Sequence, residues 1–102
     1  QIKRGRCEDF LSVDECKKVY DFYNQLTTKG IWLTDHTIIR ASSASKLFSI
    51  AKDDLGHYMI AVDNDTVVIF FLFDKDFKLI KHFKVYDNGG LALDYDQLFH
   101  GN

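Results

Sequence analysis

The feature of this sequence that most constrains its fold is an uninterrupted apolar run from Val67 to Phe73, with aspartates on both sides. The run is too short for a membrane-spanning helix, which needs about 20 apolar residues. Its β-branched and aromatic side chains favour a strand. A half-solvated strand alternates apolar and polar residues, whereas this one is apolar on both faces. We therefore expect a strand that is covered on both sides.

Similar β-rich segments surround this run and are separated by very short polar turns. The candidate strands cover residues 57–63, 66–73 and 77–86. Because connections of two or three residues join antiparallel strands, the three segments predict a meander. Residues 46–52 fit either a further strand or a short helix, since seven residues do not fix the periodicity. Residues 31–33 and 37–41 are candidates for short strands.

Aspartate marks the turns in a chain that contains no proline. Of the 15 acidic residues, only Glu8 and Glu15 are glutamates. The short aspartate side chain accepts hydrogen bonds from nearby backbone amides, so it suits turns and helix caps. The segment from Asp63 to Asp74 lacks the central glycine and terminal glutamate of a calcium-binding loop. We therefore interpret these aspartates as hairpin residues.

An amphipathic helix is predicted over residues 13–28. Ser12 and Glu15 form the S-x-x-E pattern of a capping box, and Gly30 follows as a stop signal. Apolar residues recur at helical spacing on one face: Cys16, Val19, Tyr20, Tyr23 and Leu26. This face can cover one side of the sheet.

The bulk composition limits the class of protein. We assign residues 1–102 to a single domain, since a chain of this length can form one core. Its apolar fraction of 46% and charged fraction of 27% are those of a globular protein. A net charge of −2 provides no overall attraction to nucleic acid or to anionic membranes, so we expect neither as a partner.

The number and spacing of the cysteines and histidines match no metal-binding motif. Cys7 and Cys16 permit one disulfide, and the sequence leaves open whether they are bonded. We favour reduced thiols and a cytoplasmic location, because disulfides form in oxidising compartments. The histidines are scattered singly, and phosphate-binding glycine motifs are absent. We therefore expect no metal and no cofactor.

Together these elements predict an α+β fold, with an N-terminal amphipathic helix packed on a four- or five-stranded antiparallel β-meander. Alternate residues of Val67–Phe73 point to opposite faces, and the helix covers one of them. The other face is left to the C-terminal segment, to residues 31–41 or to another chain. An apolar face that nothing in the chain covers is typical of an interface.

The predicted partner-binding site lies on this second face. Its centre is Phe70 and Leu72, and the next strand adds a basic, amphipathic register. The predicted residues are Phe70, Leu72, Ile80, His82, Lys84 and Tyr86. Two interpretations remain open: a solvated face roofed by the chain's own tail, or an interface with another protein or a second copy.

The enzymatic alternative is catalysis that needs no fixed motif. A metal-free ribonuclease uses a general acid, a general base and cations that stabilise the charge on phosphate. A helix followed by a meander resembles the element order of small ribonuclease toxins of the barnase and RelE kind. This resemblance implies RNA cleavage, with candidate residues His36, Arg40, His57 and His82. RNA binding favours a basic protein, however, and this chain is slightly acidic.

By elimination we favour a protein that is not an enzyme. No nucleophile elbow occurs, and no cysteine lies near a histidine in the sequence. The favoured hypothesis is a small protein-binding module, such as an inhibitor, an immunity protein or an accessory factor. A ligand pocket between helix and sheet is the third hypothesis. The sequence does not identify the partner or fix the oligomeric state.

Overall fold

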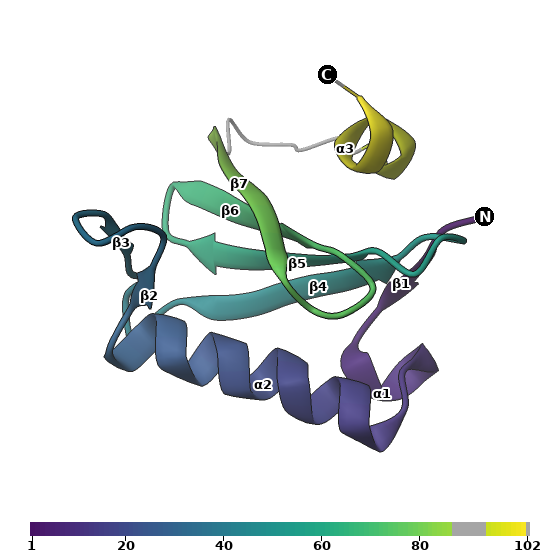
Figure 1. Cartoon of the computed structure of the whole chain (residues 1–102), viewed down its shortest axis with the longest axis horizontal. Helices are drawn as coiled ribbons and strands as arrows, with labels where there is room; N and C mark the ends of the chain where they lie inside the picture. Colours follow the sequence, from purple (N-terminus) through teal and green to yellow (C-terminus); the bar gives the residue numbers. More distant parts are fainter. Residues whose placement is uncertain (87–93, 102) are drawn as a thin grey trace.

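The computed structural model describes residues 1–86 and 94–101 and has the α+β fold that the sequence predicts. The helices are α1 (Cys7–Phe10), α2 (Val13–Thr28) and α3 (Tyr95–His100). The strands are β1 (Lys3–Gly5), β2 (Ile31–Trp32), β3 (Ile38–Ile39), β4 (Lys46–Lys52), β5 (Tyr58–Asn64), β6 (Val67–Phe73) and β7 (Leu79–Tyr86). Figure 1 shows α2 against one face of the main sheet and α3 against the other.

The main sheet is antiparallel and has the order β1-β4-β5-β6-β7. Strands β4 to β7 form the predicted meander, and residues 46–52 are a strand rather than a helix. The fifth strand, β1, comes from the start of the chain and was not predicted. The short strands β2 and β3 pair only with each other, as a two-stranded sheet.

Helix α2 begins and ends where the sequence predicts. The Glu15 amide donates to Ser12 Oγ at 3.1 Å and the Ser12 amide donates to Glu15 Oε1 at 2.9 Å, which completes the capping box. Gly30 has a φ of 86° and donates its amide to the Gln25 carbonyl. The positive φ favours glycine here, and a Cβ at this position would also have to displace the end of the Ile38 side chain, whose Cδ1 would lie 2.7 Å away.

The buried face of α2 differs from the prediction at two positions, Phe22 and Tyr20. Val19 and Leu26 are fully buried, and Phe22 packs against the sheet between them. Tyr20, which the spacing placed on the same face, is 41% exposed and donates its hydroxyl to Glu8. Each fully buried aliphatic side chain contributes about 1.5–3 kcal/mol to the free energy of unfolding.

Two apolar cores, one on each face of the sheet, explain the uninterrupted apolar run of β6. Ile69, Phe71 and Phe73 pack under α2 together with Ile60 and Val62 of β5. Val68, Phe70 and Leu72 pack on the opposite face, where Tyr95 and Phe99 of α3 cover them. The chain therefore covers both faces of this strand with its own helices.

Candidate functional site

Strand β7 forms one edge of the main sheet. Its inner side pairs with β6, from Val67 opposite Tyr86 to Phe73 opposite Leu79. Within residues 1–86 and 94–101, no strand pairs with its outer side. The other edge, β1, is only three residues long, whereas β7 has eight. β7 therefore offers a long row of backbone amides and carbonyls that an added strand can use.

The charged side chains of the segment from Phe77 to Tyr86 have a single sign. Lys78, Lys81 and Lys84 are exposed, and no acidic residue occurs between Phe77 and Tyr86. None of these lysines pairs with a carboxylate in the part of the chain that the structure describes. Lys81 Nζ instead lies 5.9 Å from the centre of the Phe83 ring. The edge is thus cationic in a chain whose net charge is negative.

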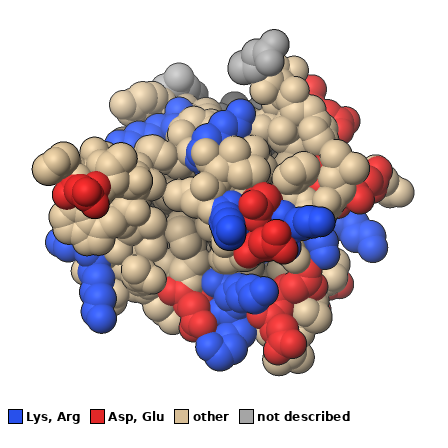
Figure 2. Space-filling model, viewed as in Figure 1, with Lys and Arg blue, Asp and Glu red and all other residues tan. Residues whose placement is uncertain are grey.

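A groove of about 340 Å³ lies between α2 and the start of β7. Its apolar lining is Phe22, Ile31, Phe73, Phe77 and Leu79, and its polar lining is Lys18, Asp21 and Gln25 of α2. Figure 2, which views this side of the molecule, shows uncharged atoms between α2 and β7, with charged side chains mainly along the borders. The groove can take apolar side chains of a segment that runs beside it.

The floor of the groove is built from packed aromatic rings. Phe22 meets Phe71 and Phe73 edge-on, with ring centres 5.0 and 4.9 Å apart. Phe77 stacks on Phe73 at 4.3 Å. On the neighbouring part of the same face, the His82 ring lies over Phe71 at 6.2 Å. Rings held by several neighbours give a preformed surface, which lowers the entropic cost of binding.

The predicted partner-binding residues do not share one face. Phe70 pairs with Phe83, and Phe71 pairs with His82, so Phe70 and His82 point to opposite sides of the sheet. The cause is a bulge: Leu72 pairs with Lys81 but Phe73 pairs with Leu79, which leaves Ile80 as the extra residue. The alternation of β7 changes at this bulge, and the sequence carries no signal for it.

Burial also corrects the predicted centre of the site. Phe70 is fully buried and Leu72 is 5% exposed, because α3 lies over both. Of the predicted set, Ile80 and Tyr86 are well exposed, at 52% and 66%. Lys84 is exposed and His82 is half-buried, both on the α2 face with Tyr86. The surface members of the set thus lie on β7, beside the groove rather than over Phe70.

The residues predicted for a ribonuclease are not assembled into one site. His36 is exposed in the turn between β2 and β3, and Arg40 donates to the Lys29 carbonyl at 3.0 Å. His57 lies in the β4–β5 turn, at the opposite end of the sheet from the β2–β3 pair, as Figure 1 shows. His82 packs over Phe71 on β7. Acid–base catalysis needs its groups within reach of one substrate, and this set does not meet that requirement.

A buried carboxylate that sequence reasoning treated only as a turn residue lies beside His57. Asp53 Oδ2 is 2.8 Å from His57 Nδ1 and 3.5 Å from His100 Nε2. Asp53 also accepts the amides of Leu55 and His57, as predicted for a turn aspartate. Burial alone would raise the pKa of the Asp53 carboxyl, but the hydrogen bonds from His57 outweigh it and lower this pKa. These contacts fit a structural role for Asp53, whose carboxylate connects the β4–β5 turn to α3.

No helix in the described parts of the chain is long and apolar enough to cross a membrane. Comparison with known proteins finds no matching family model, no matching curated protein and no matching solved structure. Function is therefore inferred from the geometry of this chain alone.

Proposed function

We propose that this chain is a non-enzymatic protein-binding module that receives an extended, acidic segment of a partner protein along β7. The observation that carries the proposal is the long edge strand β7, whose outer side pairs with no strand among residues 1–86 and 94–101. Its charged side chains, Lys81 and Lys84, are cationic, as is that of the adjoining Lys78. An inhibitor, an immunity protein or an accessory factor can act through such an edge.

In the proposed complex the partner segment becomes a sixth strand. Backbone hydrogen bonds to β7 provide affinity, and the alternating side chains of the segment provide specificity. Side chains on the α2 face reach the groove beside Phe77 and Leu79. Carboxylates reach Lys81 on one face and Lys84 on the other, since these lysines pair with Leu72 and Ile69, which point to opposite faces. Exposed Ile80 and Tyr86 add apolar contact area.

The same charges disfavour a second copy of this chain as the partner. Two β7 strands paired around a twofold axis at the strand centre would place Lys81 opposite Lys84. Like charges directly across a strand pair destabilise it. Edge lysines are a common device against this kind of self-pairing. An acidic segment of a different protein replaces that repulsion with attraction.

Selection from a random library of displayed peptides, each long enough to span β7, tests the proposal without any assumption about which protein is the partner. The expected result is enrichment of sequences in which Asp or Glu alternates with apolar residues. Binding should weaken as salt is added, because exposed charges are screened. Enrichment of basic or purely apolar sequences, or no enrichment, would contradict the proposal.

A charge-reversal pair then locates the site. Lys81→Glu with Lys84→Glu should weaken binding of a selected peptide by about tenfold or more, since each exposed ion pair contributes about 0.2–1 kcal/mol and reversal adds repulsion. The matched control is Lys3→Glu with Lys46→Glu, which makes the same change in net charge at exposed lysines of β1 and β4. Equal losses in the two proteins would show that net charge, and not the β7 edge, determines binding.

A further inference from the structure

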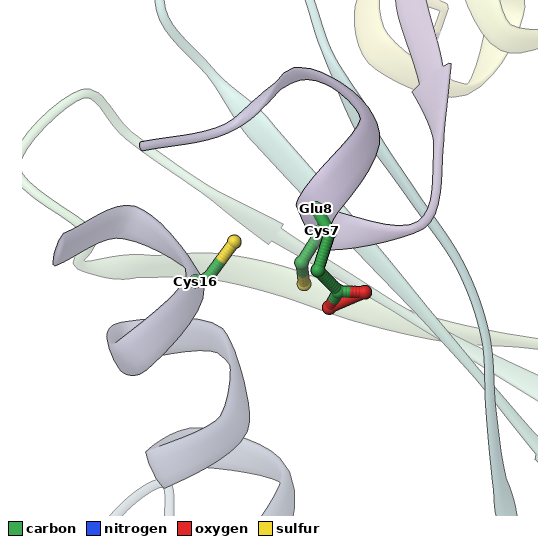
Figure 3. Close-up of side chains that lie close together, drawn as sticks. All are labelled: Cys7, Glu8 and Cys16. Atoms are coloured by element: carbon green, nitrogen blue, oxygen red, sulfur yellow. The ribbon is translucent and has the colours of Figure 1, made fainter. Parts of the chain in front are cut away.

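Two cysteines and a glutamate meet where α1 and α2 adjoin. Cys7 and Glu8 are the first residues of α1, and Cys16 is in the first turn of α2. The two sulfurs and one carboxylate oxygen all lie within 4.8 Å of one another. Figure 3 shows the side chains of Cys7 and Glu8 next to each other, with Cys16 facing them from α2.

The donor atoms determine which ion such a cluster can hold. Thiolate sulfur with a carboxylate oxygen suits Zn²⁺, whereas Mg²⁺ and Ca²⁺ take oxygen ligands only. Zinc bonds of about 2.0–2.3 Å place the ligand atoms of a tetrahedral site about 3.3–3.8 Å apart. The cluster therefore has to close by no more than about 1–1.5 Å, which side-chain rotation can supply.

We propose that Cys7, Glu8 and Cys16 form a Zn²⁺ site, with water as the fourth ligand. Tyr20 supports the site from outside, because its hydroxyl donates to Glu8 Oε1 at 2.6 Å and so orients the carboxylate. Hydrogen bonds of this kind to a ligand are typical of metal sites. This contact leaves Glu8 Oε2 available to the ion.

Burial and access are compatible with such a site. Cys7 is 1% exposed, but Glu8 is exposed and Cys16 is half-buried, so an ion can enter from their side. Bound zinc would connect the short α1 directly to α2. The sequence did not suggest this site, because its third ligand is a glutamate adjacent to Cys7 rather than a histidine or a third cysteine.

Zinc binding at this site must release the thiol protons of Cys7 and Cys16. Zinc binds thiolates and displaces these protons. Apparent affinity should therefore increase with pH, and calorimetry in buffers of different ionisation enthalpy should detect the released protons.

Titration of the fully reduced chain with Co²⁺, followed by displacement with Zn²⁺, tests the proposal. The expected result is one equivalent of Co²⁺, with sulfur-to-cobalt charge-transfer absorption, tetrahedral d–d bands and loss of both on addition of Zn²⁺. Absence of the charge-transfer band in the folded, reduced chain would overturn the proposal. The proposal would also be overturned if the two thiols form a disulfide and the reduced chain takes up no metal.

Variants identify the ligands. Cys16→Ala should remove the charge-transfer band, or shift it to that of a single thiolate, and weaken Co²⁺ binding by at least about a hundredfold. Glu8→Gln should weaken Co²⁺ binding by at least about tenfold. Loss of a hydrogen bond that supports a ligand already costs about 10–100-fold in affinity, so loss of a ligand should cost no less. Asp14→Asn, the same carboxylate-to-amide change at an exposed site in α2, should alter affinity by less than about twofold. Circular dichroism confirms that each variant is folded. Unchanged affinity in Cys16→Ala or Glu8→Gln would overturn the assignment.

Discussion

At the scale of single residues, Glu15 connects helix capping to tertiary packing. One carboxylate oxygen accepts the Ser12 amide, and the other accepts Lys52 Nζ at 2.7 Å together with the Tyr58 hydroxyl. Burial alone would raise the pKa of Glu15, but the hydrogen bonds from Lys52, Ser12 and Tyr58 outweigh it and lower this pKa to about 2. A single side chain thus attaches the start of α2 to β4 and β5.

Glu15→Gln should lower the free energy of unfolding at pH 7 by about 2 kcal/mol, since hydrogen bonds to a charged group contribute about 1.5–3 kcal/mol. The folded pKa lies below the unfolded value near 4.5, so this stabilisation is present above pH 4.5 and is lost as pH falls towards 2. Urea unfolding of both proteins at several pH values measures it.

Two results would contradict this account of Glu15. One is a difference in the free energy of unfolding between the two proteins that stays constant from pH 7 to pH 2. The difference should change with pH, because Glu15 titrates and the Gln side chain that replaces it is neutral throughout. The other is an equal loss at pH 7 in Asp14→Asn, which removes an exposed carboxylate from the same helical turn.

Burial also separates residues that the sequence grouped together. Phe70→Asp should prevent folding, because an unpaired charge in the core under α3 costs several kcal/mol of a total stability of about 5–15 kcal/mol. Tyr86→Asp, on the exposed end of β7, should change the free energy of unfolding by about 0.5 kcal/mol or less. Near-ultraviolet circular dichroism distinguishes the two. A folded Phe70→Asp variant would show that this face is open.

At the scale of elements, the six-residue helix α3 closes the second core. Tyr95 and Phe99 are each 7% exposed and pack over Phe70 and Leu72. The Tyr95 hydroxyl lies 2.7 Å from Ser49 Oγ, and the Arg4 guanidinium lies 5.1 Å from the centre of the Tyr95 ring. His100 contacts Asp53 at the end of the helix. These contacts hold a helix that is too short to be stable alone.

Phe99→Ala should release α3 and lower the free energy of unfolding by about 3–5 kcal/mol, as for other large-to-small aromatic substitutions in a core. The variant should also bind the dye ANS, since the second face of β6 becomes exposed. A control is Asp96→Ala, at an exposed position of the same helix. An equal response in both variants would mean that α3 does not seal this face.

The sequence predicted those elements that carry their own local signals. Helix α2 has a capping box and a glycine stop, and β5 to β7 are separated by aspartate turns, so their order and pairing followed. Residues 46–52, which form β4, had been left open between a strand and a helix. β1 and α1 were missed because Lys3–Gly5 and Cys7–Phe10 are too short to show a period. The bulge at Ile80 was missed because it depends on pairing with β6, and it changed the face assigned to half of β7.

At the scale of the whole molecule, three layers account for the distribution of free surface. Helices α2 and α3 cover the two faces of the sheet, as Figure 1 shows. In the described parts of the chain, β7 is the longer of the two edge strands, and no strand pairs with its outer side. The apolar run that suggested an interface is therefore internal, and the proposed binding surface is the cationic edge next to it.

This arrangement predicts a monomer. Both faces of β6 are already buried, and self-pairing of β7 would place lysine opposite lysine. Sedimentation equilibrium of the purified chain should give the monomer mass of 11.8 kDa across the concentration range. Raising the salt concentration should not change this result. A dimer would contradict the argument from charge, and a dimer that forms only at high salt would show that repulsion alone prevents pairing.

The most direct test of the central claim is amide hydrogen exchange of the chain with and without a selected acidic peptide. We predict new protection in β7, Leu79–Tyr86, with little change in β1 at the opposite edge. This protection should disappear in the chain that carries Lys81→Glu and Lys84→Glu. Protection confined to α2, to α3 or to β1 would contradict the proposed binding mode, because the partner would then bind elsewhere on the molecule.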